Sequence, residues 1–420
     1  MRIARFAWII LGIMVLLDFY VFQAIKVICQ NQSQKTKVFI YGGYWTLSAT
    51  ILIFLALLPF LNFVSWPAHF RNYFFAIIIG LLFAKLFAAV FLMLDDLRRL
   101  IQWASGKLFF RNTEGENISS DGIARSVFMS WLGLGIGGGL FSTLMYGFSN
   151  KYNYKIHRVN LEFANLPDSF RGLKIIQVSD IHSGSFTNKR SVQHGVDMVL
   201  KENPDLILFT GDLVNDQAIE MADYMDVFSK LKAPMGVYSI LGNHDYGDYY
   251  YGSHPEGELA VEKAKNLDHL KKIHAQLGWR LLLDEHVALE RNNQSIALIG
   301  VQNISGRKSF HSYGDMAKAY AGSEGYPFRI LMSHDPSHWD YEVTSKYKNI
   351  DLTLSGHTHG MQFGVEIPGF RWSPVQYVYK EWAGLYEEGK QKIYVNRGYG
   401  FIGYPGRVGI LPEITTIVLT

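Results

Sequence analysis

The chain has 420 residues, of which 49% are hydrophobic, and its 40 basic and 37 acidic residues leave a formal net charge of +3. So small a charge argues against wholesale binding of nucleic acid, and no nucleic-acid partner is expected. The single cysteine, Cys29, excludes an intrachain disulfide and a thiolate metal cluster, so any metal must be bound by His, Asp, Asn or Glu side chains.

Residues 1–150 are predicted to form a transmembrane region, because they contain four apolar stretches close to the ~20 residues that a spanning helix needs. The stretches cover residues 6–27, 46–64, 73–94 and 127–148. Arg2 and Arg5 precede the first stretch, as in a signal peptide, but it is too long and lacks a small-residue cleavage site, so we interpret it as a retained anchor. The alternative, a set of buried core helices, is disfavoured because four such stretches follow one another.

Two ionisable residues lie inside these stretches: Asp18 in the first and Lys85 in the third, each twelve positions from the start. Because the first and third helices cross in the same direction, equal offsets predict equal depth. An isolated charge at mid-bilayer costs at least ~2.5 to 3.5 kcal/mol, so we expect the two side chains to form an ion pair. The alternative is separate snorkelling of each side chain or a local water defect.

The fourth stretch is rich in glycine, which lets helix backbones approach closely. Its glycines are Gly133, Gly135, Gly137, Gly138 and Gly139. We expect them to pack within the four-helix unit, with a homodimer contact as the second use. Eight Lys and Arg residues flank the span ends on one side and six on the other. The positive-inside rule therefore favours an external C-terminal region.

Residues 151–420 change to short β-branched runs separated by polar, helix-like stretches, which is the pattern of an α/β sandwich. The predicted strands are 174–178, 206–209, 236–240, 280–283, 295–301, 329–332, 352–354, 392–395 and 414–419. The predicted helices are 191–202, 220–231 and 259–277. We therefore expect a second domain over this whole region.

Polar side chains follow five of the predicted strands at the point where each strand ends. They form the motifs Ser179-Asp180-Ile181-His182, Thr210-Gly211-Asp212, Gly242-Asn243-His244-Asp245, Ser333-His334-Asp335 and Gly356-His357-Thr358-His359. An open α/β sheet places its ligand site at the carboxyl ends of its strands. Glycines in these motifs let the backbone turn sharply and approach an ion without a Cβ in the way. Each motif alone is more often structural than metal-binding, but five in order indicate one metal site.

These five motifs resemble the calcineurin-like metallophosphoesterase superfamily, and the resemblance covers about residues 172–420. The later segments 381–386 and 395–400, Glu-Trp-Ala-Gly-Leu-Tyr and Val-Asn-Arg-Gly-Tyr-Gly, further resemble its bacterial membrane-associated YkuE-type branch. The membrane region resembles no family that we can name. The resemblance implies a four-layer αββα sandwich, here preceded by four transmembrane α-helices, and two divalent metal ions bridged by one carboxylate.

Transferred residue by residue, the resemblance assigns one ion to Asp180, His182, Asp212 and His359. It assigns the other ion to Asp212, Asn243, His334 and His357. Carboxylate, amide and imidazole ligands suit Mn, Fe or Zn, and the sequence leaves the identity of the metal open. A structural role for His334 alone, in a turn fixed by Pro336, is the alternative for that residue.

The same resemblance implies phosphoester hydrolysis, in which two ions bind a bridging hydroxide as nucleophile and stabilise in-line displacement. His244 is expected to donate a proton to the leaving oxygen. Asp245 is expected to orient the His244 imidazole, as a carboxylate partner commonly does. The family often has Glu where this chain has Asp245, and the shorter side chain keeps the charge.

Two sets of side chains near the motifs bear on the substrate. Four tyrosines could form an apolar wall for an acyl chain, stack on a base, or belong to a packed loop: Tyr246, Tyr249, Tyr250 and Tyr251. Five basic residues are candidate phosphate contacts or else solvated charges: Arg307, Lys308, His311, Arg397 and Arg407.

Tethering to a bilayer makes a lipid-borne or envelope-linked phosphodiester or pyrophosphate the expected substrate, in what we interpret as an integral multi-pass protein of a bacterial cytoplasmic membrane. One alternative is a UDP-2,3-diacylglucosamine pyrophosphatase of lipid A synthesis, which would require a cytoplasmic catalytic domain. A non-catalytic phospholipid sensor or scaffold is an alternative of another class, disfavoured because no expected ligand or proton donor is missing. A transporter is disfavoured because Asp18 and Lys85 offer few groups for a pathway.

Overall fold

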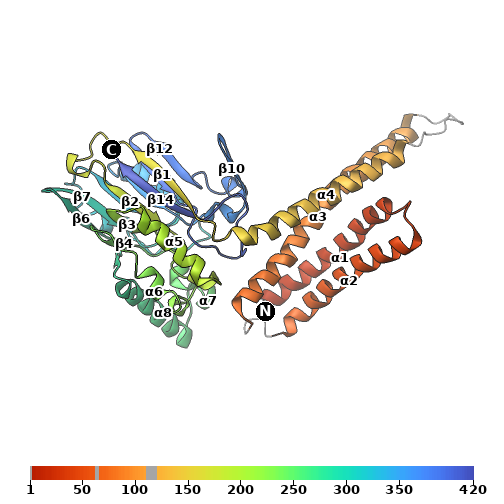
Figure 1. The fold of residues 1–420 in the computed structure, drawn as a ribbon, viewed down its shortest axis with the longest axis horizontal. Helices are drawn as coiled ribbons and strands as arrows, with labels where there is room; N and C mark the ends of the chain where they lie inside the picture. Colours follow the sequence, from red (N-terminus) through yellow and green to blue (C-terminus); the bar gives the residue numbers. More distant parts are fainter. Residues whose placement is uncertain (1, 62–65, 110–120) are drawn as a thin grey trace. The chain divides into compact units, whose positions relative to one another are not determined.

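A computed structural model describes residues 2–61, 66–109 and 121–420 (Figure 1). The chain divides into two compact units, Met1–Tyr146 and Gly147–Thr420. The first unit consists of the helices α1 (Arg2–Ile28), α2 (Gln34–Leu57), α3 (Ala68–Phe109) and most of α4 (Asp121–Asn150). All four are long and apolar enough to cross a membrane, so this is an integral multi-pass membrane protein.

All four helices extend beyond their predicted spans, and α2 at its start and α3 at its end do so by the most residues. α2 begins at Gln34, before the predicted start at residue 46, because the Ser33 side chain accepts a hydrogen bond from the backbone N–H of Thr36 and caps the helix at 3.2 Å. α3 continues past residue 94 through Asp95, which pairs with Arg98 and Arg99 three and four positions later at 2.8 and 3.0 Å. The end of the second predicted span, residues 62–64, lies outside the described residues.

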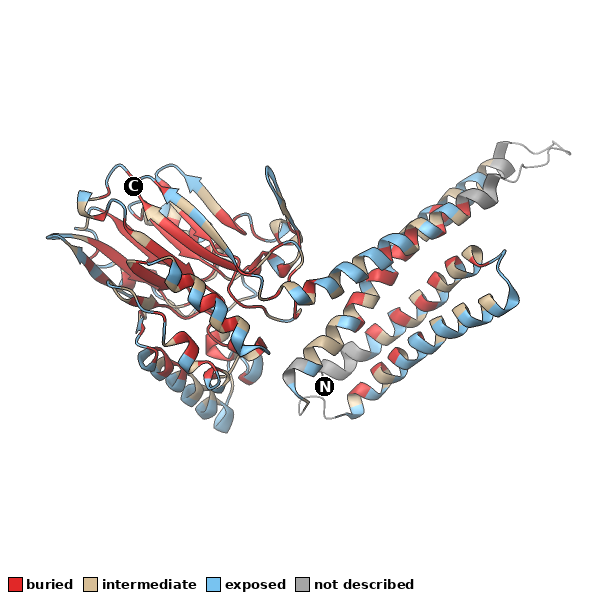
Figure 2. Ribbon diagram, in the orientation of Figure 1, coloured by how far each residue is buried: buried red, intermediate tan, exposed pale blue. Residues whose placement is uncertain are grey.

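The predicted pairing of Asp18 with Lys85 is confirmed, since the Lys85 ammonium donates to Asp18 Oδ1 in a buried ion pair. Asp18 is fully buried, although many positions on the helices around it are exposed (Figure 2), among them the apolar Leu16 and Phe19. The same carboxylate oxygen accepts hydrogen bonds from Ser48 Oγ at 2.7 Å and from Tyr44 Oη at 3.0 Å. Three helices therefore meet at one polar cluster, which stabilises a charge that lipid could not.

Part of the glycine-rich face of α4 packs within this unit. Gly133 and Gly137 lie against the backbone of α3 at Ala88 and Ala84, so closely that a side chain at Gly137 would collide with the Ala84 carbonyl. Gly135 has no such neighbour within 4 Å of its ideal Cβ position. The expected packing within the four-helix unit is thus confirmed for two glycines, and the homodimer contact stays a prediction.

The second unit contains two six-stranded mixed sheets. In spatial order, the first sheet comprises β1 (Lys155–Leu161), β14 (Glu413–Leu419), β2 (Lys174–Val178), β3 (Leu206–Phe209), β4 (Val237–Ser239) and β5 (Arg280–Leu281). The second comprises β12 (Gly384–Glu388), β13 (Gln391–Val395), β9 (Leu352–Ser355), β8 (Arg329–Met332), β7 (Gln294–Gly300) and β6 (Glu285–Arg291). A separate two-stranded hairpin is formed by β10 (Val365–Ile367) and β11 (Phe370–Trp372).

The two sheets pack face to face, because the buried side chains of β2 and β3, such as Ile175 and Leu208, share one core with Leu298 and Ile330 of β7 and β8. The outer face of the first sheet is covered by α5 (Lys189–Lys201) and α8 (Gly257–Gln276), and that of the second by α9 (Met316–Tyr320) and a π-helical segment, Trp339–Val343. The second unit also contains the short α-helices α6 (Met225–Phe228), α7 (Asp248–Tyr251) and α10 (Thr344–Lys346) and several 3-10 turns. This is the expected four-layer αββα sandwich.

The predicted helix 220–231 is wrong, because a 3-10 turn, Ala218–Met221, and the short α6 occupy this segment. The Glu220 carboxylate accepts backbone hydrogen bonds from Asn215, Asp216 and Gln217 at 2.6, 3.1 and 3.0 Å and so ties the segment to the preceding loop. The sequence prediction also missed β1, β6, β10, β11 and β12, several of which are edge or hairpin strands. Such strands bury only part of their side chains, which weakens their hydrophobic pattern.

Candidate metal centre

The five sequence motifs lie at the carboxyl ends of five strands, β2, β3, β4, β8 and β9. The first three run parallel in one sheet, and β8 and β9 run parallel in the other. Because parallel strands end at the same edge of a sheet, the loops that follow them meet there. The predicted ligand residues are brought together at this edge in two groups, each with ligand atoms within 4.8 Å of one another.

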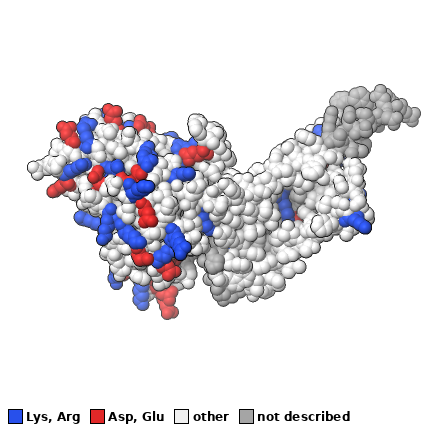
Figure 3. All heavy atoms as spheres, in the orientation of Figure 1, with Lys and Arg blue, Asp and Glu red and all other residues white. Residues whose placement is uncertain are grey.

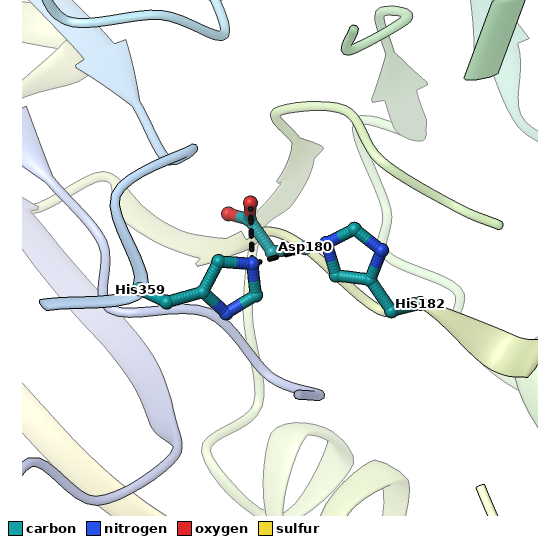
Figure 4. A group of neighbouring side chains, drawn as sticks. All are labelled: Asp180, His182 and His359. Carbon is teal, nitrogen blue, oxygen red and sulfur yellow. Dashed lines mark hydrogen bonds and ion pairs between the residues drawn. The ribbon is translucent and has the colours of Figure 1, made fainter. Parts of the chain in front are cut away.

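The first group consists of Asp180, His182 and His359, all of them buried (Figure 4). His359 Nε2 lies 3.3 Å from Asp180 Oδ1 and 3.0 Å from His182 Nε2. Asp180 is itself held in place by the backbone N–H of His357, which donates to both carboxylate oxygens at 3.0 Å. Residues from two sheets are thereby locked around one point.

The second group consists of Asp212, His334 and His357, and the side chain of Asn243 joins it. Asn243 Oδ1 lies 2.7 Å from His357 Nδ1 and 3.2 Å from His334 Nε2. The Asn243 amide nitrogen points the other way and donates to Tyr249 Oη at 3.1 Å. The Asn243 side-chain oxygen, which is the amide atom able to bind a metal, therefore faces the second group.

Asp212 lies between the two groups. Its Oδ2 atom is 3.1 Å from His334 Nε2 in the second group and 3.6 Å from His182 Nε2 in the first. Its Oδ1 atom accepts a hydrogen bond from the backbone N–H of His244 at 2.8 Å, which fixes the rotation of the carboxylate. This position is the one required of a carboxylate that bridges two ions.

The donor set fits a pair of divalent cations. In each group, buried imidazole nitrogens and carboxylate oxygens lie so close that their lone pairs repel one another. A bound cation would remove this repulsion. His334 Nδ1 lies 2.8 Å from the Thr210 carbonyl, which can only accept, so this nitrogen carries the proton and Nε2 presents a lone pair to the group. His357 is oriented in a similar way, because its Nε2 atom lies 2.8 Å from Tyr379 Oη.

The backbone at this centre is strained. Five ligand residues adopt a left-handed conformation that side chains other than glycine rarely adopt, with φ of 53° at Asp180, 49° at His182, 60° at Asp212, 71° at His357 and 51° at His359. Each such residue costs of order 1 to 3 kcal/mol and persists only where surrounding contacts over-determine it. This clustering of strain is a second, independent mark of a functional site.

Electrostatics at the centre follow from burial and from the neighbouring charges. Burial lowers the pKa of His182 well below its ordinary value, and so favours the neutral imidazole that binds metals. Burial would raise the pKa of the Asp212 carboxyl, but the surrounding imidazoles, His334 first among them, hold it well below its usual range. Burial opposes a proton on His334, whereas Asp212 favours one and raises its pKa to about 10. A bound cation would take the place of that proton.

His244 borders the pocket beside the two groups and is only partly buried. Its Nδ1 atom lies 2.7 Å from the Asn215 carbonyl, so Nδ1 carries a proton and Nε2 is the atom available for proton transfer. The Tyr249 ring stacks on the imidazole with 4.4 Å between ring centroids. These contacts fix the orientation of a side chain that the sequence predicted as the proton donor.

The orienting role predicted for Asp245 is wrong. Its two oxygens accept four backbone hydrogen bonds, from Asp212 at 2.9, Leu213 at 2.8, Val214 at 3.3 and Gly242 at 2.9 Å. Asp245 therefore clamps the loops that carry Asp212 and Asn243, and the Asn215 carbonyl orients His244. A short carboxylate suits this task, because the amide groups lie directly around it.

Three of the four tyrosines after His244 take one of two roles, and Tyr250 is exposed. Tyr249 lies at the site through its contacts with His244 and Asn243. Tyr246 is buried and stacks on Tyr313, and Tyr251 is buried beside Gln217. The packed-loop interpretation therefore holds for two of the four.

The two candidate arginines near the C-terminus, offered as phosphate contacts or solvated charges, are buried and paired within the fold, so neither is a solvated charge. Arg397 pairs with Glu413 and with Glu366, each at 2.5 Å. Arg407 is fully buried and donates to backbone carbonyls, including that of Arg397 at 2.7 Å. Of the other basic candidates, Arg307 packs over the Tyr379 ring at 5.0 Å, whereas Lys308 and His311 are exposed.

A pocket of about 290 Å³ opens onto the metal groups and is lined by both polar and apolar residues. The polar residues, which we call the polar wall, include Asp212, Asn243, His244 and His357. The apolar residues, which we call the apolar wall, are Phe310, Met361, Val375, Val378 and Ile402. Tyr379 also lines the pocket, with its hydroxyl on His357.

We expect Tyr379→Phe to weaken metal binding by roughly 10- to 100-fold, because it removes the hydroxyl that orients His357 while keeping the ring. The measurement is a titration of the purified, metal-depleted protein with Mn²⁺. Tyr377→Phe is the matched control, since Tyr377 is 77% exposed on the same loop and should leave the titration unchanged. Equal affinities for the wild type and Tyr379→Phe would show that the hydroxyl has no orienting role.

Comparisons with known proteins agree with this geometry. Residues 2–151 match the family described as a probable calcineurin-like phosphoesterase, transmembrane domain, so the membrane region does have relatives, although none was identified from its sequence pattern. Residues 173–361 match the calcineurin-like phosphoesterase family, a range that spans all the predicted ligands.

Three relatives illustrate the similarity. A transmembrane protein with metallophosphoesterase domain from Danio rerio is 29% identical over 319 residues, which are 75% of this chain and 67% of that protein. The uncharacterized metallophosphoesterase YkuE of Bacillus subtilis is 30% identical over 257 residues, 60% of this chain and 81% of that protein. Phosphodiesterase YaeI of Escherichia coli is 27% identical over 260 residues, 61% of this chain and 85% of that protein. The expected resemblance to the YkuE type is confirmed.

Proposed function

Since the chain belongs to the calcineurin-like metallophosphoesterases and carries an N-terminal transmembrane domain, we propose that this metal-dependent hydrolase cleaves a phosphodiester or pyrophosphate bond of a lipid or envelope-linked substrate. The observation that carries the proposal is the position of Asp212 Oδ2, 3.1 Å from His334 and 3.6 Å from His182, in a residue that lines a pocket with an apolar wall.

The ligand assignment follows the two groups. Asp180, His182 and His359 would hold one ion, His334, His357 and Asn243 the other, and Asp212 would contact both. When bound, two divalent cations supply a nucleophile from water at neutral pH and polarise the phosphoryl oxygens. Mn, Fe and Zn all suit this mixture of oxygen and imidazole donors. The ligand residues hold the ions in place and balance their charge. Buried hydrogen bonds fix the loops that carry these residues.

His244 would complete the reaction by giving a proton to the leaving oxygen. Its Nδ1–H donates to the Asn215 carbonyl, which fixes the ring and leaves Nε2 for the pocket where the leaving group would lie. A positioned acid of this kind contributes about 10²- to 10⁴-fold to the rate.

His244→Asn is therefore expected to lower the hydrolysis of an alkyl phosphodiester by about 10²-fold or more and that of a p-nitrophenyl diester far less. An alkoxide leaves only with a proton, whereas p-nitrophenolate leaves without one. The readout is the ratio of kcat/KM for the two esters, with bound metal measured in both proteins. An equal loss on both esters would contradict the role of proton donor.

The proposed specificity is tested with the full-length protein in detergent micelles and Mn²⁺. We expect bis-p-nitrophenyl phosphate or a dialkyl pyrophosphate to be hydrolysed faster than p-nitrophenyl phosphate, because a diester and a pyrophosphate both place an apolar group on the far side of the phosphorus, where the pocket wall is apolar. A clear preference for the monoester would overturn the proposal.

A further inference from the structure

The hairpin formed by β10 and β11 exposes its apolar face and turns its charged face toward the rest of the protein. Its cross-strand pairs are Val365 with Trp372, Glu366 with Arg371, and Ile367 with Phe370. Because side chains alternate between the two faces of a strand, the apolar pairs lie on one face and the charged pair on the other. The apolar face is turned outward: Val365, Ile367 and Phe370 are 41%, 58% and 54% exposed.

The charged face of the same hairpin is turned toward the sandwich. Glu366 pairs with the buried Arg397 at 2.5 Å, and the Arg371 guanidinium lies over the Trp382 ring at 5.1 Å. A hairpin in water buries its apolar face and exposes its charges. The opposite arrangement here is fixed by specific ionic and cation–π contacts, so the outward orientation of the apolar face is a stable part of the fold.

More exposed apolar residues continue from the hairpin toward the metal pocket. We define the hairpin face as Met361, Val365, Ile367, Phe370, Tyr377 and Val378, which are all exposed. Tyr377 joins the base of the hairpin, where its hydroxyl lies 3.4 Å from the Trp372 indole nitrogen. Met361 and Val378 also line the pocket. The hairpin face and the apolar wall of the pocket are therefore one continuous surface.

The base of the hairpin is tied to the end of the last membrane helix within the second unit. α4 is a candidate membrane span as far as Asn150, and the carbonyl of its Gly147 accepts a hydrogen bond from the Arg407 backbone at 2.9 Å. The next residue, Val408, donates to the Gln362 carbonyl at 2.8 Å and accepts from Gly364 at 2.9 Å. Gly364 immediately precedes β10, so hydrogen bonds through residues 407 and 408 link Gly147, in the last turns of α4, to the base of the hairpin.

We propose that the hairpin face seats in the headgroup layer of the bilayer and brings the mouth of the metal pocket to the level of lipid phosphates. An amphipathic tryptophan and tyrosine at its base and apolar side chains at its tip suit this layer, and the charged residues of the hairpin are turned away from it. In Figure 3 charged side chains are scattered over the second unit, whereas the loop at the tip of the projecting β10 hairpin of Figure 1 consists of Ile367-Pro-Gly-Phe370.

From this placement, which rests on the proposed function, we infer that the substrate is a phosphate ester whose apolar portion remains in the bilayer. Its phosphate would reach the metal groups while its chain lies along Val378 and Met361, which belong to both surfaces. Water-soluble esters would still enter the pocket, because the hairpin lies outside it and contributes no residue to the polar wall.

The hairpin contact is tested first by its depth, without reference to activity. Full-length protein carrying Cys29→Ser is given a single cysteine at Ile367→Cys, spin-labelled and placed in phosphatidylcholine and phosphatidylglycerol vesicles. The matched control is Asn293→Cys, at the exposed turn of the β6–β7 hairpin on the opposite side of the sandwich (Figure 1). We expect the label at 367 to collide more with oxygen than with a water-soluble nickel complex, and the label at 293 to do the reverse.

A label at 367 that is as accessible to nickel as the label at 293 would overturn the proposal. So would a label shielded from both reagents to a degree that rises with protein concentration, because that result would assign the face to a second copy of the chain.

The substrate class is tested by the double variant Ile367→Asp/Phe370→Asp. Its release of products from vesicles of a total polar lipid extract, measured by mass spectrometry, is expected to fall at least ten-fold, with bis-p-nitrophenyl phosphate hydrolysis unchanged. Equal loss on both substrates, or no lipid product from the unchanged protein, would overturn the substrate class. Absence of any hydrolysis by the unchanged protein would overturn the proposed function, and the label at 367 would still decide the membrane contact.

Discussion

Replacing Asp212 by alanine is expected to lower phosphodiester hydrolysis by at least about 10³-fold and to remove bound metal, because catalytic groups that act as a unit fail together. Asp212 is the residue whose carboxylate lies within reach of both ligand groups, at 3.1 Å from His334 and 3.6 Å from His182. Without it, neither ion would keep a complete set of ligands. The measurement is kcat/KM for bis-p-nitrophenyl phosphate, together with the metal content of the purified protein.

Asp212→Asn is a second variant that distinguishes loss of the carboxylate from failure of Asp212→Ala to fold. Asparagine tolerates the left-handed backbone at this position, where φ is 60°, and its oxygen can still accept the hydrogen bond from His244 N–H. We expect it to fold and to lose metal and activity through the missing charge. Asp226→Asn, at an exposed position on α6, is the control and should behave as wild type. Normal activity in Asp212→Ala would refute the bridging role.

Replacing Lys85 by alanine is expected to destabilise the helical unit by roughly 3 to 5 kcal/mol, because removal of one partner leaves the other charge buried and unpaired. Asp18 is fully buried, and without Lys85 the partners of its carboxylate among the described residues would be the hydroxyl groups of Ser48 and Tyr44. The measurement is the unfolding midpoint in detergent, followed by the circular dichroism of the helices.

Two further variants separate the pair from general damage. Asp18→Leu/Lys85→Leu removes both charges and is expected to recover most of the lost stability, since apolar replacement of a buried pair is often neutral. Lys35→Ala, at an exposed position near the start of α2, is the control and should leave the midpoint unchanged. Should Lys85→Ala match that control, the ion pair would contribute nothing to the stability of the unit.

The ion pair and the ligand set could both be predicted from sequence, for related reasons. Equal offsets of Asp18 and Lys85 in two parallel spans fixed their depth, and lipid made an unpaired charge costly. At the metal centre, the strand ends fixed the position of each motif along the sheet edge. In both cases a helix or a strand sets the position of the residue, and the cost of burying a charge or the ligand needs of a metal ion sets its partner.

What could not be predicted depends on tertiary contacts that carry no local pattern. Asp245 was assigned to His244 because they are neighbours in the chain, yet its carboxylate is surrounded by backbone amides that the folded loops bring together. Tyr379 lies far from the motifs in sequence and reaches His357 only through the fold.

The β10–β11 hairpin was missed because its apolar residues face outward, which removes the pattern that marks a strand covering a core.

The most direct test of the central claim is the number of metal ions per chain in the full-length protein, measured by elemental analysis after purification in detergent and equilibration with Mn²⁺. The ligand geometry predicts two ions per chain in the wild type, a diester hydrolase activity that chelation abolishes and Mn²⁺ restores, and fewer than two ions in Asp212→Asn. A wild-type protein that binds no metal, or that hydrolyses the diester equally well after chelation, would contradict it.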